Sequence, residues 1–204
     1  MIRYMASMGQ CSDPSAPGFD PMGIRLVPGL IEVITSETTA PGQRHAALAG
    51  HEGAIALRGW LGQPSDPRSQ KLGVDWILGI AWRPYQRDDF VTPPFPGYIS
   101  GHSTFSRSAA EVLAAITGDE FFPGGYAEFV AKKNEYLVHE QGPTQTVRLR
   151  WATYFDAADQ AGISRLYGGI HPRTDDFTGR RVGSTVGRGA YALAKTYFEG
   201  SARP

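Results

Sequence analysis

Two helical patterns joined through a pair of glycines constrain the fold of this chain more than any other feature. Residues 151–167 and 175–198 both carry apolar side chains at helical spacing, and Gly168-Gly169 interrupts the pattern where the first segment ends. A helix that ends at glycines can turn sharply. Arg165, on the last turn, and His171, just beyond the glycines, are therefore predicted to face one pocket.

Further segments predict a mainly α-helical bundle. Helical spacing recurs over residues 45–61, 74–82, 104–116 and 126–139. Residues 144–149 alternate briefly and are predicted to be extended or a loop, and residues 26–34 to be a short helix or strand. Neither an internal repeat nor a βαβ alternation is present, so the expected fold class is an α-helical bundle.

Helix ends are also readable from the sequence. Gly118 follows the segment 104–116 and is predicted to be its C-cap. Thr174 or Asp175 is predicted to be the N-cap of the last helix.

The N-terminal part of the chain predicts irregular structure. Residues 9–43 hold five prolines and many glycines, which disfavour continuous helix. We therefore expect an irregular segment over residues 1–40 and a helical domain over residues 41–204.

Composition excludes several classes of protein. Twenty basic and twenty acidic side chains balance, so no basic excess supports binding to nucleic acid. Cys11 stands alone and cannot form an internal disulfide. No apolar run approaches the roughly 20 residues that span a bilayer, and the first residues lack the apolar core of a signal peptide. We expect a soluble protein without nucleic-acid or membrane partners; its location and oligomeric state stay open.

The stretch SRLYGGIHPRTD, residues 164–175, has the residue types of a catalytic site. Asp175 follows His171 by four residues, a spacing at which a carboxylate can accept the imidazole N–H that faces away from a substrate. Arg165 offers a planar set of donors that matches the oxygens of a phosphate-like anion. The alternative interpretation is an ordinary helix–turn–helix with a solvated arginine and a capping aspartate.

A second stretch, YISGHSTFS at residues 98–106, complements the first. Ser100-Gly101-His102 precedes the apolar segment 109–116, so it is predicted to form a helix N-terminus, where main-chain amides can approach an anion. His102 suits proton transfer near neutral pH. Taken alone, such a serine is usually a helix cap and such a histidine a surface residue. Together the two stretches favour a site for a tetrahedral oxyanion.

A third element is Arg83-Pro84. Pro84 is predicted to end the helix over residues 74–82 and to direct Arg83 from its end.

Other kinds of site lack support in the sequence. His45 and His51 are six residues apart and would not share a helix face, and no zinc, EF-hand, P-loop, dinucleotide or GxSxG motif is present. On the last helix, Arg180, Arg181 and Arg188 are expected to form a solvated face. An apolar stripe on the same helix is expected to be core; it comprises Val182, Val186, Tyr191, Leu193 and Tyr197.

The three elements together resemble the motif set of one superfamily, which joins vanadium-dependent haloperoxidases, type 2 phosphatidic acid phosphatases and bacterial class A acid phosphatases. The motif SR-x3-G-x-H-x3-D is met at every defined position by residues 164–175. The middle motif, usually PSGH, has Ile99 in place of proline. Residues 92–106, TPPFPGYISGHSTFS, are most similar to the soluble haloperoxidase branch, and the resemblance covers residues 74–198.

The resemblance implies a role for each matching residue. Arg83, Ser100, Gly101 and Arg165 would bind the oxygens of vanadate or phosphate. His171 would be the ligand of vanadium in a haloperoxidase, which needs vanadate as cofactor, or the nucleophile in a phosphatase, which needs none. Asp175 would orient His171, and His102 would be the acid–base group. Phe95 would line the halide side of the pocket.

One position departs from the family pattern. The family carries a lysine six residues before Arg-Pro, and Trp76 occupies that position here. The side chain that adds positive charge beside the oxyanion is therefore missing. Candidate replacements are Lys71, Arg87 and Arg173.

Three functions remain open from the sequence. The first is oxidation of halide by hydrogen peroxide at a bound vanadate. The second is hydrolysis of a phosphate ester through a phosphohistidine. The third is a non-catalytic member that retains the pocket, a reading that Trp76 supports. Because haloperoxidases usually carry a long helical region before the first motif, the resemblance also suggests the C-terminal portion of a longer protein.

Overall fold

The computed structural model describes residues 6, 9–84 and 97–202, and the chain divides into two compact units. Unit 1 comprises residues 1–90 and 137–142, and unit 2 comprises residues 91–136 and 143–204. Within the described residues, none of the helices combines the length and the apolar character that crossing a membrane requires. The predicted boundary at residue 40 stays a prediction.

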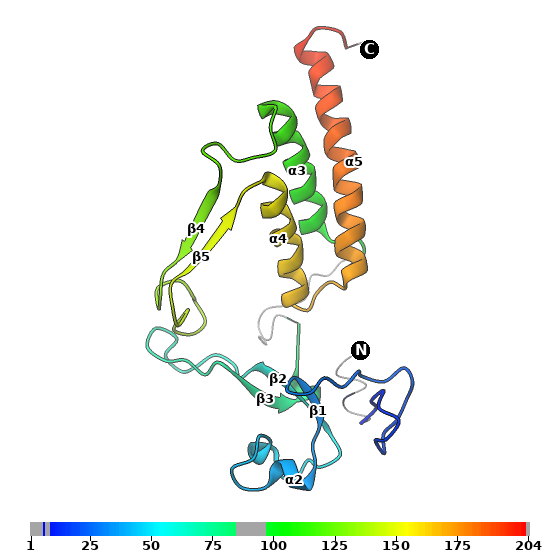
Figure 1. The fold of residues 1–204 in the computed structure, drawn as a ribbon, viewed down its shortest axis with the longest axis vertical. Helices are drawn as coiled ribbons and strands as arrows, with labels where there is room; N and C mark the ends of the chain where they lie inside the picture. Colours follow the sequence, from blue (N-terminus) through cyan, green and yellow to red (C-terminus); the bar gives the residue numbers. More distant parts are fainter. Residues whose placement is uncertain (1–5, 7–8, 85–96, 203–204) are drawn as a thin grey trace. The chain divides into compact units, whose positions relative to one another are not determined.

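Unit 1 is built around a small antiparallel sheet. Its strands are β1 (Ile31–Val33), β2 (Ile55–Trp60) and β3 (Val74–Leu78), in the order β1-β2-β3. The short helix α2 (Ser36–Thr39), labelled in Figure 1, and the 3₁₀ turn η1 (Ala46–Leu48) lie between β1 and β2, and the 3₁₀ turn η2 (Gly79–Ala81) follows β3. Residues 137–142 join this unit through Glu140, whose Oε2 accepts from Trp60 Nε1 at 3.0 Å and from the Gly73 amide at 2.9 Å.

In the core of unit 1, a buried histidine packs against a tryptophan. Trp76 packs with Ile34 and Ala56 and meets the ring of His45 edge-on at 4.5 Å. His45 is completely buried, and its Nδ1 lies 2.9 Å from Thr38 Oγ1. Because the Thr38 hydroxyl donates to the Thr35 carbonyl, the hydrogen of neutral His45 resides on Nδ1. His45 Nε2 has no hydrogen-bond partner among the described residues.

The helices predicted over residues 45–61 and 74–82 are wrong. The first segment contains η1 followed by β2, and the second contains β3 followed by η2. Residues 55–57 are all buried, and a strand covered on both faces reads as a continuous apolar run that local spacing cannot distinguish from a helix. The antiparallel pairing of β2 with β3, from Ala56–Leu78 to Trp60–Val74, makes both segments strands instead of helices.

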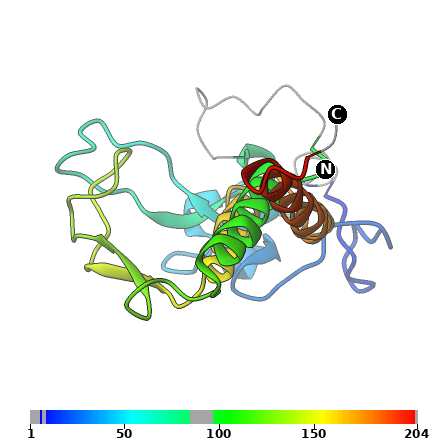
Figure 2. The same ribbon diagram turned by 90° about the horizontal axis from the view of Figure 1, so that it is seen from above.

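Unit 2 contains the helices α3 (Gly101–Thr117), α4 (Tyr154–Tyr167) and α5 (Arg173–Phe198). Its other element is an antiparallel pair of strands, β4 (Ala127–Ala131) and β5 (Val147–Trp151). Figures 1 and 2 show α3 lying side by side with α5, whose C-terminal part extends beyond α3 in Figure 1. The helices predicted over residues 104–116, 151–167 and 175–198 are confirmed, with shifts at their ends.

The helix ends follow the predicted chemistry in part. Gly118 caps α3 in the left-handed conformation, as predicted. Pro172, instead of Thr174 or Asp175, occupies the N-cap position of α5. Thr153 caps α4 through a reciprocal pair of hydrogen bonds with Asp156, so this helix begins after Trp151.

The helix predicted over residues 126–139 is wrong, because residues 127–131 form β4. Phe129 and Val130 favour a strand, and β4 pairs with β5 from Ala127–Trp151 to Ala131–Val147. The fold is thus a helical-bundle domain with added sheet, and the prediction of a mainly α fold is confirmed only for its bundle.

Glycines on α5 allow α3 to approach closely. A Cβ at Gly179 would lie 2.9 Å from the Ser100 carbonyl oxygen, and one at Gly187 would lie 2.5 Å from the Ser108 carbonyl oxygen. Gly183, between them, faces the Thr104 carbonyl even more closely. The spacing of four residues keeps these glycines on one face of α5, so the two helix backbones meet there.

The core stripe expected on α5 is wrong, and the solvated arginine face expected there is confirmed for Arg181 and Arg188 but wrong for Arg180. The stripe expected to be core is largely exposed, at 52% for Val186 and 60% for Leu193. Arg180, expected to be solvated, is mostly buried between the carboxylates of Asp159 and Asp176. The face of α5 that packs in unit 2 is the one that carries the glycines, which leaves the apolar stripe outside.

We predict that Gly183→Ala destabilises unit 2. The added methyl group would collide with backbone of α3, and such overpacking typically costs about 1–3 kcal/mol. Gly189→Ala is the matched control, since nothing lies within 4 Å of a Cβ there and alanine favours the helix. Urea unfolding checks both variants. Equal stability of the two variants would contradict this account of the helix contact.

The buried His45 predicts that unit 1 loses stability on acidification. Burial lowers the pKa of His45 below its ordinary value of 6.5, although the Glu32 carboxylate opposes the shift. The unfolded chain then binds a proton more readily, so the stabilisation is complete above pH 6.5 and is lost as the pH falls toward the lower folded value.

Urea unfolding at a series of pH values between about 7 and 5 measures this loss. His45→Phe should flatten the dependence because the ring no longer titrates. His51→Phe replaces an exposed histidine and should retain the wild-type slope. A wild-type slope that His45→Phe leaves intact would refute the assignment.

Candidate functional site

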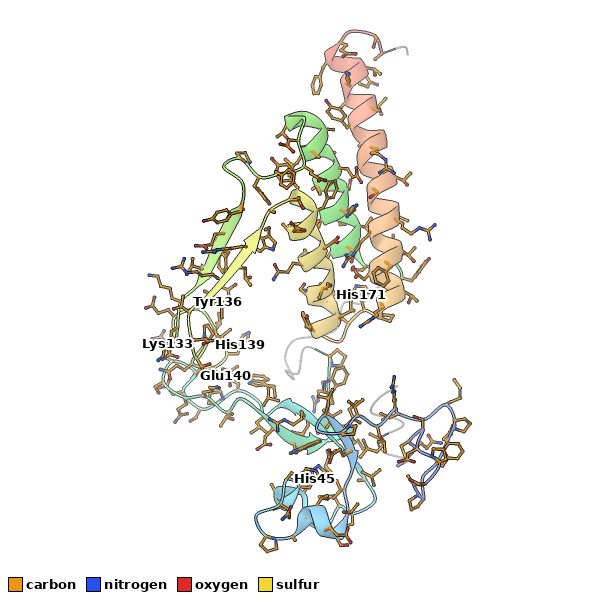
Figure 3. All side chains as sticks on the ribbon, in the orientation of Figure 1. His45, Lys133, Tyr136, His139, Glu140 and His171 are labelled. Carbon is orange, nitrogen blue, oxygen red and sulfur yellow. The ribbon has the colours of Figure 1, made fainter. Side chains whose placement is uncertain are left out.

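A tight connection between α4 and α5 positions Arg165 and His171. Gly169 takes a positive φ of 71°, and the Ile170 amide donates to the Arg165 carbonyl at 3.2 Å. The chain therefore reverses directly after Arg165, on the last turn of α4, and His171 lies just before the start of α5. Figure 3 shows the labelled His171 at this connection.

His171 is held by the carboxylate predicted from the spacing. Its Nδ1 lies 3.0 Å from Asp175 Oδ2, and their side chains are only 6% and 10% exposed. A carboxylate at Nδ1 fixes the hydrogen on that nitrogen and leaves Nε2 available for a ligand or a substrate atom.

The N-terminus of α3 is fixed to the same aspartate. The Ser100 amide donates to the Asp175 carbonyl at 3.2 Å, and the Ser103 amide donates to Ser100 Oγ at 3.3 Å. The backbone at Gly97 also lies against the His171–Asp175 pair, since a Cβ there would be 3.5 Å from Asp175 Oδ2. The two sequence stretches thus meet in unit 2, with Gly101 as the first residue of α3.

The electrostatics of His102 connect it with two basic residues of the stretch 164–175. Partial burial lowers the pKa of His102, and the positive charges of Arg165 and His171 lower it further. His102 is still exposed at the surface. Near pH 7 the His102 ring is therefore mostly neutral.

A buried polar network lies directly beneath these residues. Ser103 Oγ is 2.7 Å from Asp176 Oδ1 and 2.9 Å from Ser100 Oγ. Arg180 binds both carboxylate oxygens of Asp176, through Nε at 3.0 Å and Nη2 at 2.8 Å, and its Nη1 lies 2.7 Å from Asp159 Oδ2. The network joins α3, α4 and α5.

Sequence reasoning missed this network. Its available signal was the second aspartate in the pair Asp175-Asp176, followed by Arg180 at the spacing of an ion pair within a helix. Ser103 and Asp159 belong to the other two helices, so their participation depends on the tertiary fold.

The roles predicted for several other site residues stay predictions. Arg83 belongs to unit 1 and is exposed after η2, so the helix expected to direct it is absent and its place in the pocket stays a prediction. Phe95 and Arg87 lie outside the described residues. Ser100 is completely buried, and its hydroxyl contacts Ser103.

The donor set favours an anion over a metal cation. Within the described ranges, no group of three or more His, Cys, Asp or Glu side chains could hold a metal ion. The cluster instead offers His102, Arg165 and His171, with Asp175 directed at His171. Such a set of donors fits a tetrahedral oxyanion such as vanadate or phosphate.

Comparison with known families identifies the class to which this fold and cluster belong. Residues 52–200 match the family described as the VCPO second helical-bundle domain, so the chain belongs to that family of helical-bundle domains. The match begins ahead of residue 74, where the motif resemblance starts. It places the chain in the vanadium haloperoxidase superfamily, as predicted.

Solved structures agree on the fold. An apo-type bacterial vanadium-dependent chloroperoxidase has a TM-score of 0.59 and 18% identity, over 72% of this chain and 29% of that one. A holo-type bacterial vanadium-dependent chloroperoxidase has a TM-score of 0.54 and 19% identity, over 67% of this chain and 26% of that one. The chain thus spans less than a third of either structure. No curated protein matches it.

Trp76, at the position of the family lysine, belongs to the core of unit 1. It is 8% exposed, and the Arg58 guanidinium lies 5.9 Å from its ring centre. We predict that Trp76→Lys destabilises unit 1 by about 3–5 kcal/mol, as loss of a buried tryptophan does, because the ammonium would also be buried near Arg58.

Urea unfolding measures the cost. Val74→Lys is the matched control, since it introduces the same side chain at a 55% exposed position of the same strand and should stay within about 0.5 kcal/mol of wild type. If Trp76→Lys were as stable as the control, position 76 would be free to carry the family lysine.

Proposed function

We propose that the cluster on α3, α4 and α5 binds a tetrahedral oxyanion and that the protein acts as a vanadium-dependent haloperoxidase, oxidising halide with hydrogen peroxide. The observation that carries the proposal is that the two sequence stretches meet at Asp175, whose side chain lies 3.0 Å from His171 Nδ1 and whose carbonyl accepts from the Ser100 amide at the start of α3. This arrangement brings His171 and the N-terminus of α3 together as donors for one anion.

Each residue has a distinct role in this proposal. Arg165 and the amides at Gly101 bind anion oxygens, because Gly101 opens the N-terminus of α3. His171 offers Nε2 as the ligand of vanadium, while Asp175 holds Nδ1 at 3.0 Å and makes the ring a better donor. The roles that the family resemblance implies for Arg83 and Phe95 stay predictions, and the buried Ser100 hydroxyl contacts Ser103.

The lowered pKa of His102 favours the peroxidase over the phosphatase. A neutral imidazole can accept a proton from hydrogen peroxide, whereas departure of an alcohol from a phosphate ester requires a proton donor. When bound, vanadate would supply the Lewis-acidic centre for peroxide activation. His102 then takes up and returns the proton at the edge of that centre.

Phosphate ester hydrolysis is the second candidate. It is favoured by the presentation of His171 Nε2, which an imidazole oriented by a carboxylate can use as a nucleophile without any cofactor. Trp76, in place of the family lysine, favours weak turnover in either reaction.

Thermal unfolding with increasing orthovanadate tests anion binding. Only the folded protein assembles the donors, so the wild type should gain about 2.7 kcal/mol of stability at a vanadate concentration a hundred times its Kd. His171→Ala should lose the effect. His51→Ala, which removes an exposed histidine of unit 1, should keep it.

Two activity assays then separate the candidates. Bromination that requires both vanadate and hydrogen peroxide supports the haloperoxidase, and hydrolysis of p-nitrophenyl phosphate that vanadate inhibits supports the phosphatase. The absence of any vanadate-induced shift in the wild type would overturn the proposal, as would an equal shift in His171→Ala.

A further inference from the structure

The polar network beneath the site has the properties of a positioning device. We refer to Ser103, Asp159, Asp176 and Arg180 as the latch. Asp176 is 2% exposed and Ser103 is completely buried. Desolvating a carboxylate and a guanidinium is costly, and apolar side chains of similar size often stabilise a core as well. The hydrogen bonds of the latch are satisfied in one arrangement of the three helices. The latch therefore determines how α3, α4 and α5 lie relative to one another.

Each hydroxyl in this part of the network has a defined role as donor or acceptor. Ser103 has a single hydroxyl hydrogen, and the shorter contact of 2.7 Å directs it to the Asp176 carboxylate. Ser103 Oγ is then left to accept from the Ser100 hydroxyl at 2.9 Å. The N-cap of α3 is thus connected through Ser103 to the first turn of α5.

Neighbouring residues carry the connection into the site. Asp176 follows Asp175, which binds His171 by its side chain and Ser100 by its carbonyl. On α3, Ser103 follows His102. A sliding of α3 along α5 would therefore change the distance between His102 and His171, and it would break the bond between Ser103 and Asp176.

Helix α4 is held by the same group. Arg180 reaches Asp159 through Nη1 at 2.7 Å and donates from Nη2 to the Asp159 carbonyl at 3.2 Å. Gly162, one turn further along α4, leaves room for this approach, because a Cβ there would lie 2.9 Å from Ser103 Oγ. Arg165 lies on the following turn of the same helix.

We propose that the latch sets the distances among His102, Arg165 and His171, with Ser103 and Asp176 as positioning residues for the anion site. The effect of the latch on anion binding and turnover rests on the proposed function. Its effect on the pKa of His102 can be measured in the protein without anion. The latch proposal and the proposed function can therefore be refuted separately.

The decisive variant is Ser103→Ala, and the chain offers a matched control. Ser184 also joins α5 to α3 through a hydroxyl, accepting from Arg107 Nε at 3.0 Å, and it is linked to the latch indirectly, because Arg107 Nη1 lies 3.5 Å from Asp159 Oδ1. Ser184→Ala therefore removes the same chemical group from the same helix pair. Asp176→Asn is a second test of the latch that preserves side-chain size and removes the charge that binds Arg180.

The first measurement is an NMR titration of His102 in protein without anion. In Ser103→Ala and Asp176→Asn the pKa of His102 should rise toward its ordinary value, since displacement of the ring would relieve its burial and weaken the influence of Arg165 and His171. In Ser184→Ala the pKa should stay at the wild-type value. An unchanged pKa in both latch variants, or the same rise in the control, would overturn the proposal.

The second measurement is the Kd for orthovanadate, with kcat and KM where turnover is detected. Displacement of the groups by even 1 Å can lower a rate by about a hundredfold, so kcat should fall about ten- to a hundredfold in the latch variants. Vanadate affinity should fall as well, while the control retains both. Failure of the wild type to bind vanadate would refute the proposed function. The NMR titration of His102 would still test the role of the latch in that case.

Discussion

The close contact between α3 and α5 is the constraint on which the rest of unit 2 depends. Glycines at positions 179, 183 and 187 remove the side chains that would separate the two helices, and the backbones then pack against each other. Only at that separation can a hydroxyl as short as that of Ser103 reach the carboxylate of Asp176. Burial of that carboxylate in turn requires Arg180, which reaches across to α4.

Asp175 links this packing to the chemistry of the site. Its carboxylate orients His171, and its carbonyl fixes the Ser100 amide at the beginning of α3. Because Asp175 directs its charge at His171, the positive field of Arg165 and His171 still reaches His102 and lowers its pKa.

The sequence predicted what depends on local spacing and failed where partners lie far apart in the chain. The long helices of unit 2 and the His171–Asp175 contact follow from separations of three or four residues, which local pattern captures. The strands β2, β3 and β4 were predicted as helices because pairing with a distant strand overrides local spacing. Arg180 was misjudged for the same reason, since Asp159 on another helix helps to bury it.

Trp76 stands at a motif position of the family but serves as a core residue in this protein. Spacing from Arg83 assigns this position to a lysine, but here it lies on a strand, with its ring against His45 and beneath the Arg58 guanidinium. An indole satisfies both contacts, whereas an ammonium would be desolvated beside another cation. A cation that replaces the family lysine therefore has to come from another element. Arg173 is exposed at the first residue of α5, close in sequence to His171 and within the same unit, so its guanidinium could serve the anion without entering a core.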